Sequence, residues 1–123
     1  MTTLVVDDDP AIRELVAHTL KRANFSVLTA NSGLEAISLL QSHKEQIDLL
    51  VTDITMPGMN GLELAKHLTA FGFDIPVLFM LGQSVSPGDE FVSAGFVAKP
   101  FVAGALLEEI RRLMLQADSL VIK

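Results

Sequence analysis

Acidic side chains gather after two short apolar segments of this chain. Asp7-Asp8-Asp9 follows the apolar run Leu4-Val5-Val6, and Asp53 comes shortly after Leu49-Leu50-Val51. Carboxylates held close together repel one another, so either their pKa values rise or a cation lies among them. A hard divalent ion such as Mg²⁺ suits an all-oxygen ligand set better than zinc or iron does. Taken alone, an acidic triplet is more often a helix cap and a solvated loop.

A lysine follows a third candidate strand. Lys99-Pro100 comes directly after Phe96-Val97-Ala98. Two strands beyond Asp53 is about 10 Å of sheet, and the four-carbon stem of lysine covers more than half of that distance. A lone loop lysine is usually a solvated surface charge, so the interpretation depends on the combination with the acids. Pro100 is a candidate for a cis peptide bond, although trans is the commoner form before proline.

The composition excludes several other classes of function. The 123 residues include no Cys, Tyr or Trp, which rules out disulfides, zinc–thiolate sites and thiol catalysis. A net charge of −6 has the wrong sign for direct binding to nucleic acid. The N-terminus lacks the basic region of a signal peptide, and no apolar run is long enough to span a membrane. We therefore expect a soluble, cytoplasmic protein.

The segments that would position these side chains alternate between strand and helix. Apolar blocks bounded by acids, Pro or Gly predict five strands, at Leu4–Val6, Phe25–Ala30, Leu49–Val51, Val77–Leu81 and Phe96–Ala98. Helical periodicity predicts helices over about Pro10–Ala23, Ser32–His43, Gly61–Phe71 and Ala103–Ala117, and a two-turn helix beginning near Ser86.

Two of these helices carry clear start signals. Asp9 before Pro10 predicts an N-cap, and Ser32 followed by Glu35 predicts a capping box. The spacing of the first helix predicts a buried face made of Ile12, Leu15, Val16, Thr19, Leu20 and Ala23.

Five strand–helix units in succession predict an α/β fold with a parallel sheet, right-handed crossovers and helices on both faces. We expect a single domain over residues 1–123, a flavodoxin-like three-layer sandwich with five strands in the order 2-1-3-4-5 and five helices, the fourth short. In that order the strands before Asp7 and Asp53 are neighbours, so their carboxylates converge at the carboxyl edge of the sheet, where ligands bind in such folds.

Three segments of the chain resemble the signature regions of the receiver domains of response regulators, the phospho-accepting modules of two-component signal transduction. They are Leu4–Arg13, Asp53–Gly61 and Ala94–Phe101, and the similarity spans essentially the whole sequence. Because the three motifs occur in order, at strand ends and at near-family spacing, the resemblance is specific.

The resemblance implies a role for each candidate residue. Asp53 would be the phospho-accepting residue, and Lys99 would contact the phosphoryl group. Mg²⁺ would be held by Asp7, Asp8, Asp53 and the backbone carbonyl of Thr55. Asp9 is then left with the helix-cap role.

The same resemblance implies a phosphorelay function rather than an enzyme that turns over a separate substrate. The phosphoryl donor would be a histidine kinase or a histidine phosphotransfer protein, and phosphorylation would switch contact with an unidentified downstream protein. We expect a stand-alone bacterial relay or adaptor, similar to chemotaxis regulators, that is a monomer or a weak homodimer and contacts neither nucleic acid nor membrane directly.

Two switch positions depart from the family pattern. Receivers usually have Thr or Ser at the end of the fourth strand, where this chain has Leu81, and Phe96 is a switch aromatic without a hydroxyl group. Leu81 and the short fourth helix favour an alternative, a pseudo-receiver that serves as a constitutive binding or dimerisation module.

An enzymatic alternative is a phosphatase of the haloacid-dehalogenase type. Asp7-x-Asp9 after a first strand imitates the nucleophile motif of that family. This alternative fits poorly, because Ala11 stands where Thr or Val is expected.

Overall fold

The computed structural model of the chain describes residues 1–43, 45–82 and 94–122. Within them, five parallel strands form one sheet in the order β2-β1-β3-β4-β5, which confirms the predicted topology. The strands are β1 (Thr2–Val6), β2 (Ser26–Ala30), β3 (Leu49–Asp53), β4 (Val77–Leu81) and β5 (Gly95–Ala98). The helices of the described residues are α1 (Pro10–Arg22), α2 (Gly33–Ser42), α3 (Gly61–Ala70) and α4 (Ala103–Ile122).

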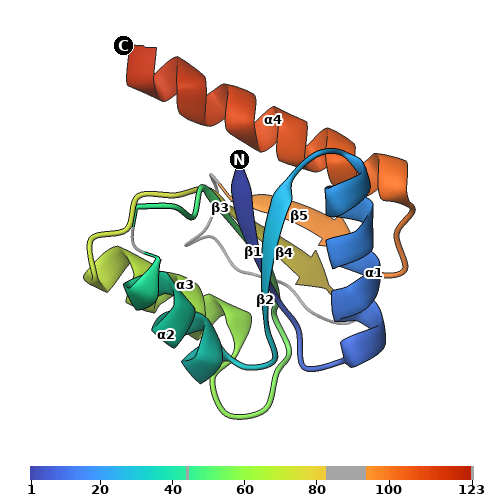
Figure 1. Cartoon of the computed structure of the whole chain (residues 1–123), viewed down its shortest axis with the longest axis vertical. Helices are drawn as coiled ribbons and strands as arrows, with labels where there is room; N and C mark the ends of the chain where they lie inside the picture. The colour runs from blue at the N-terminus through green and yellow to red at the C-terminus, as the bar shows by residue number, and fades with distance from the viewer. Residues whose placement is uncertain (44, 83–93, 123) are drawn as a thin grey trace.

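Helices cover both faces of the sheet, α1 and α4 on one side and α2 and α3 on the other (Figure 1). Successive side chains of a strand point to opposite faces, so Val5 packs toward α1 and α4 while Leu4 packs toward α2 and α3. Burial on both faces explains why the strands are continuous apolar runs rather than alternating ones. No helix in the described part of the chain is both long and apolar enough to cross a bilayer.

The first helix begins as predicted, and one position of its predicted buried face is wrong. The Asp9 carboxylate accepts a hydrogen bond of 2.9 Å from the Ala11 N–H, which makes Asp9 the N-cap of α1. The predicted buried position Leu15 is wrong, because its side chain is 50% exposed. Val16 and Leu20 are buried as predicted, Ala17 is buried as well, and Leu15 lies on the opposite side of the helix from these three residues.

The predicted capping box of α2 forms only in part. The Ser32 hydroxyl accepts a hydrogen bond from the Glu35 N–H at 3.1 Å, but the Glu35 carboxylate accepts from the N–H of Asn31, not from that of Ser32. A complete capping box occurs at α3, where Asn60 and Glu63 each accept from the other's N–H. This second box was not among the predicted helix caps.

Two predictions about organisation are not tested by this structure. The short helix expected near Ser86 falls outside the described residues. That residues 1–123 form a single domain also stays a prediction.

The last helix ends at Ile122 instead of near Ala117, so it is longer than the sequence pattern indicated.

Candidate functional site

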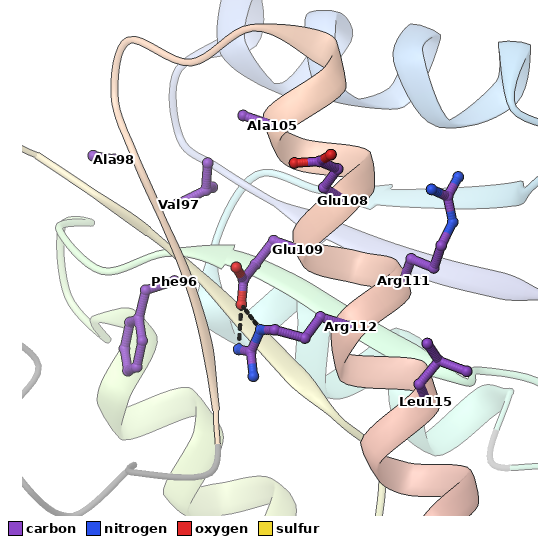
Figure 2. Close-up of a pocket in the computed structure, with 9 residues that line it drawn as sticks. All are labelled: Phe96, Val97, Ala98, Ala105, Glu108, Glu109, Arg111, Arg112 and Leu115. Atoms are coloured by element: carbon purple, nitrogen blue, oxygen red, sulfur yellow. Dashed lines mark hydrogen bonds and ion pairs between the residues drawn. The ribbon is translucent and has the colours of Figure 1, made fainter.

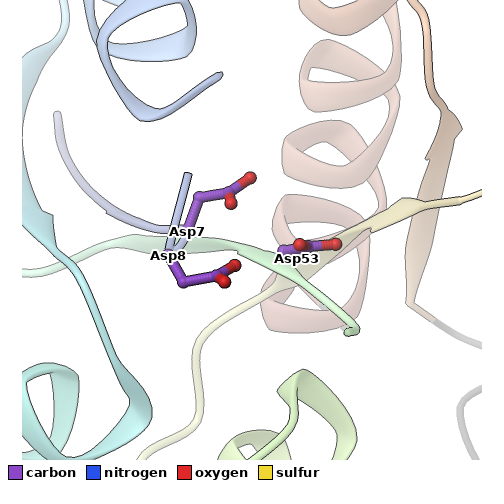
Figure 3. A group of neighbouring side chains, drawn as sticks. All are labelled: Asp7, Asp8 and Asp53. Atoms are coloured by element: carbon purple, nitrogen blue, oxygen red, sulfur yellow. The ribbon is translucent and has the colours of Figure 1, made fainter. Parts of the chain in front are cut away.

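Three aspartates meet at the carboxyl edge of the sheet. Asp7 directly follows β1, Asp53 is the last residue of β3, and these strands are paired with Val6 opposite Thr52. One carboxylate oxygen each from Asp7, Asp8 and Asp53 lies within 4.8 Å of the others. Figure 3 shows the three side chains side by side at the ends of their strands. We call this group the carboxylate cluster.

The members of the carboxylate cluster differ in burial. Asp7 is fully buried and Asp53 is 7% exposed, whereas Asp8 is exposed. Burial raises the pKa of Asp7 above its ordinary value, and the nearby Asp53 acts in the same direction. The hydrogen bond from the Asp9 N–H and the ammonium group of Lys99 oppose this rise without cancelling it. The ionised form of Asp7 is therefore destabilised by its surroundings, and a further cation beside it would reduce this destabilisation.

Lys99 links two of these carboxylates. It follows β5, and its side chain reaches past β4 to place Nζ 3.2 Å from Asp7 Oδ2 and 3.2 Å from Asp53 Oδ2. Burial lowers the pKa of Lys99, but the two carboxylates outweigh burial, and the pKa lies above the ordinary value. The Lys99 N–H donates to the Leu81 carbonyl at 2.8 Å, and the Lys99–Pro100 peptide is cis.

Contacts with α3 fix the backbone at Asp53. The Gly61 N–H donates to the Ile54 carbonyl at 2.9 Å, and the Ile54 N–H donates to the Met80 carbonyl at 3.3 Å. A Cβ atom on Gly61 would lie 2.2 Å from the Asp53 carbonyl oxygen. Only glycine permits this approach of the helix to the strand end. Gly61 therefore sets the position of the Asp53 backbone.

The remaining predicted residues near the cluster occupy separate places. Asp9 caps α1 and is not part of the carboxylate cluster, so Asp7 and Asp9 do not act as the pair that the phosphatase alternative requires. Thr55 lies in the exposed loop two residues after Asp53.

The two switch positions belong to one apolar cluster. Leu81 ends β4, and both Leu81 and Phe96 pack against a buried group that contains Ile54 and Phe79. The rings of Phe79 and Phe96 are stacked, with centroids 5.7 Å apart and planes at 22°. A hydrophobic side chain thus replaces the hydroxyl group that receivers usually carry at this strand end.

Sequence reasoning missed one polar contact of the cluster. Arg13, in the second turn of α1, donates from Nη1 to the backbone carbonyl of Asp7 at 2.8 Å. The signal that points to it is a basic residue close to a helix N-terminus, where the helix dipole disfavours positive charge.

A shallow depression of about 660 Å³ lies away from the carboxylate cluster, between β5 and α4. Its lining includes Phe96, Leu115 and the ion pair of Glu109 with Arg112 (Figure 2). It contains no member of the carboxylate cluster, so the site described above is a separate feature.

Comparisons with known proteins point to one family. Response regulator MprA of Mycobacterium leprae (strain TN) is 37% identical over 118 residues, 93% of this chain and 51% of that protein. MprA of Mycobacterium tuberculosis (strain ATCC 25618 / H37Rv) is 37% identical over 115 residues, 90% of this chain and 49% of that protein. The chain thus spans about half the length of the curated relatives it matches.

Solved structures show the same fold. The chemotaxis protein CheY4 of Vibrio cholerae superposes with a TM-score of 0.80 at 32% identity, covering 91% of this chain and 97% of that one. A response regulator receiver domain protein from Clostridium thermocellum gives a TM-score of 0.82 at 24% identity, covering 97% and 98%, and supports the fold alone. A model of the response regulator receiver domain family matches residues 3–111. The chain belongs to the response regulator receiver domain family.

Proposed function

We propose that this chain accepts a phosphoryl group on Asp53 from a phosphohistidine of a histidine kinase or histidine phosphotransfer protein. One observation carries the proposal. The Lys99 ammonium group lies 3.2 Å from both Asp7 and Asp53 within a group of three carboxylates at the sheet edge. An anionic nucleophile can approach an anionic phosphoryl group only where cations offset the negative charge, and here the Lys99 ammonium and a divalent ion held by the carboxylates would do so.

The carboxylate of Asp53 is the nucleophile in this proposal. One of its oxygens forms a bond to phosphorus as the phosphorus–nitrogen bond of the donor imidazole breaks. The imidazole nitrogen keeps the bonding electron pair, and Asp53 becomes an acyl phosphate. Lys99, already paired with Asp53, balances negative charge on the transferred group. Hydrolysis of the acyl phosphate by water returns the carboxylate.

The carboxylate cluster suits a divalent cation. Asp7, Asp8, Asp53 and the backbone carbonyl of Thr55 would hold Mg²⁺, which prefers oxygen ligands and keeps several waters. The cluster fits this ion because all its donors are oxygens and its three carboxylates lie within 4.8 Å. When bound, Mg²⁺ neutralises charge on the phosphoryl oxygens and lowers the barrier to transfer.

The product of this reaction is a modified surface rather than a released compound. We propose that the acyl phosphate on Asp53 changes the affinity of the chain for a downstream protein. The net charge of −6 favours a protein partner over nucleic acid for this part of the molecule. A cytoplasmic location and a monomeric or weakly dimeric state belong to the same proposal.

Labelling with a small phosphodonor tests the assignment. The protein is incubated with acetyl phosphate or phosphoramidate, with and without Mg²⁺, and its intact mass is measured. We expect Mg²⁺-dependent addition of one phosphoryl group, which Asp53→Asn abolishes. Asp74→Asn is the matched control, because this exposed aspartate lies outside the carboxylate cluster. Equal labelling of Asp53→Asn would refute the proposal.

One observation favours a second candidate function, a pseudo-receiver that binds its partner constitutively. Leu81 offers no hydroxyl to a phosphoryl group, and Phe96 is stacked on the buried Phe79 in the same apolar cluster. A switch needs two states whose balance the phosphoryl group changes. Loss of one hydrogen bond to a charged acceptor, about 1.5–3 kcal/mol, shifts that balance about tenfold or more.

The two functions differ in how far a signal spreads from Asp53. Beryllofluoride with Mg²⁺ mimics the phosphoryl group, and amide resonances report the response. Shifts that extend to Leu81 and Phe96 would support the switching receiver. Shifts confined to residues around Asp53 and the β1–α1 loop would support the pseudo-receiver.

A further inference from the structure

Arg13 holds the peptide group that joins two members of the carboxylate cluster. Its Nη1 donates to the Asp7 carbonyl at 2.8 Å, in a half-buried position. That carbonyl belongs to the planar peptide between Asp7 and Asp8, so fixing the oxygen also fixes the plane from which Asp8 departs. The contact runs backward along α1, from the helix to the loop before it.

The other atoms of Asp7 are held by different groups. Oδ1 accepts from the Asp9 N–H at 2.9 Å, and Oδ2 accepts from Lys99 Nζ at 3.2 Å. With the Arg13 contact, all three oxygens of Asp7 have a donor. Asp7 is therefore fixed at both its side chain and its main chain.

Asp8 depends on its backbone for placement. Its side chain is exposed, and it makes no hydrogen bond or ion pair within the described residues. Its carboxylate nevertheless lies within 4.8 Å of those of Asp7 and Asp53. The Asp7–Asp8 peptide, held by Arg13, is the nearest fixed group that sets its direction.

The position of Arg13 in the helix is consistent with such a role. Asp9 is the N-cap of α1 and Pro10 its first residue, so Arg13 is close to the positive end of the helix dipole. A basic residue there is electrostatically unfavourable unless it contacts something else. The Arg13 side chain makes no other hydrogen bond or ion pair within the described residues; the backbone N–H of Arg13 donates to the Asp9 carbonyl at 3.0 Å.

We propose that Arg13 is a positioning residue that aims the Asp8 carboxylate into the cation site by holding the Asp7–Asp8 peptide. The inference rests on the proposed function, since it concerns the same cation site. Groups that orient a metal ligand typically change metal affinity by 10- to 100-fold when removed. The expected effect of Arg13 on Mg²⁺ affinity is of this size.

Isothermal titration with Mg²⁺ tests the proposal on the full chain. Arg13→Met removes the donor and is expected to weaken Mg²⁺ binding about tenfold or more. Arg22→Met is the matched control, because it removes the same charge from the exposed far end of α1, and its affinity should stay within about twofold of the parent's. Arg13→Gln is a second variant with a shorter side chain, in case Arg13→Met does not fold.

A double-mutant cycle separates positioning from simple charge loss. If Arg13 acts through Asp8, then Arg13→Met has little further effect on Mg²⁺ affinity in a protein that already carries Asp8→Asn. Equal effects of Arg13→Met in both backgrounds would overturn the proposal. The proposal would also be overturned if the parent protein binds Mg²⁺ and Arg13→Met binds the ion with the same affinity.

Metal-free amide spectra give a readout that does not require the ion. Arg13→Met should shift the amide resonances of Asp8 and Asp9 strongly, while Arg22→Met leaves them in place. Unchanged Asp8 and Asp9 amides would overturn the inference even if the parent binds no Mg²⁺. Absence of Mg²⁺ binding and labelling in the parent, with these shifts present, would instead count against the proposed function alone.

Discussion

Thr3 places a hydroxyl group in the hydrophobic interior without a hydrogen-bond partner. The residue is fully buried in β1, and its Oγ1 is unpartnered within the described residues. Burying an unpaired hydroxyl costs about 1–3 kcal/mol, and valine has nearly the same shape without it. We expect Thr3→Val to raise the free energy of unfolding by about 1 kcal/mol.

Urea unfolding followed by circular dichroism checks this expectation. Thr29→Val, at an exposed position of the edge strand β2, controls for the strand preference of valine and should change stability by less than about 0.5 kcal/mol. A loss of stability in Thr3→Val would show that the hydroxyl finds a partner in solution.

Single residues of the candidate site were predictable from the sequence to different degrees. The positions of Asp7, Asp53 and Lys99 follow from parallel strands, whose carboxyl ends share one edge, and the structure brings these side chains together. Their chemical roles stay predictions. The basic charge of Arg13 near a helix N-terminus was a signal in the sequence, but its contact partner, the Asp7 carbonyl, was not predictable, because that contact depends on how the side chain folds back over a loop.

At the scale of elements, α3 approaches β3 so closely that one position excludes any side chain. A Cβ on Gly61 would lie 2.2 Å from the Asp53 carbonyl oxygen, which is backbone and cannot move aside on its own. We expect Gly61→Ala to lower the free energy of unfolding by about 1–3 kcal/mol, typical of an overpacked site. Displacement of Asp53 should also slow labelling by acetyl phosphate.

Gly104→Ala provides the control for this prediction. Gly104 lies in α4 with no atom within 4 Å of the added methyl group. Alanine in a helix is favoured over glycine by about 0.5–1 kcal/mol, so this variant should gain stability. Equal stability of Gly61→Ala and the parent would contradict the close approach.

The N-terminus of α3 gives a second prediction at this scale. The Asn60 side chain accepts from the Glu63 N–H at 2.8 Å, and the Glu63 carboxylate accepts from the Asn60 N–H at 3.0 Å. We expect Asn60→Ala to cost about 1 kcal/mol of stability, and Asn60→Asp to keep most of it. Thermal unfolding of the two variants checks this, and a neutral Asn60→Ala would show that the cap contributes nothing.

Element types were more predictable than their faces and ends. Short apolar runs indicated all five strands, but hydrogen bonding placed Gly95 inside β5 and left Phe25 before β2. The buried face of α1 was predicted with Leu15 included, because periodicity alone does not say which side of an apolar stripe meets the sheet. The predicted capping box of α2 is incomplete because the Glu35 carboxylate accepts from the N–H of Asn31, one residue before the N-cap Ser32.

At the scale of the whole molecule, the strand order brings together residues that no single strand or helix contains. The order β2-β1-β3-β4-β5 makes β1 and β3 neighbours, although 42 residues lie between Val6 at the end of β1 and Leu49 at the start of β3. Helices on both faces then make each strand apolar throughout, in agreement with a composition that is 50% hydrophobic. The carboxylate cluster therefore exists only in the folded chain.

Because Asp53 is far from Asp7 and Asp8 in the sequence, Mg²⁺ bound at the cluster should stabilise the whole fold. A ligand that binds only the folded state adds about 2.7 kcal/mol when its concentration is 100 times Kd. We expect the melting temperature to rise with Mg²⁺ at constant ionic strength, and Asp8→Asn, which removes an exposed carboxylate from the cluster, to reduce the rise strongly. Asp74→Asn should respond like the parent. A melting temperature of the parent that is independent of Mg²⁺ under these conditions would show that the folded chain does not use the cluster to bind this ion.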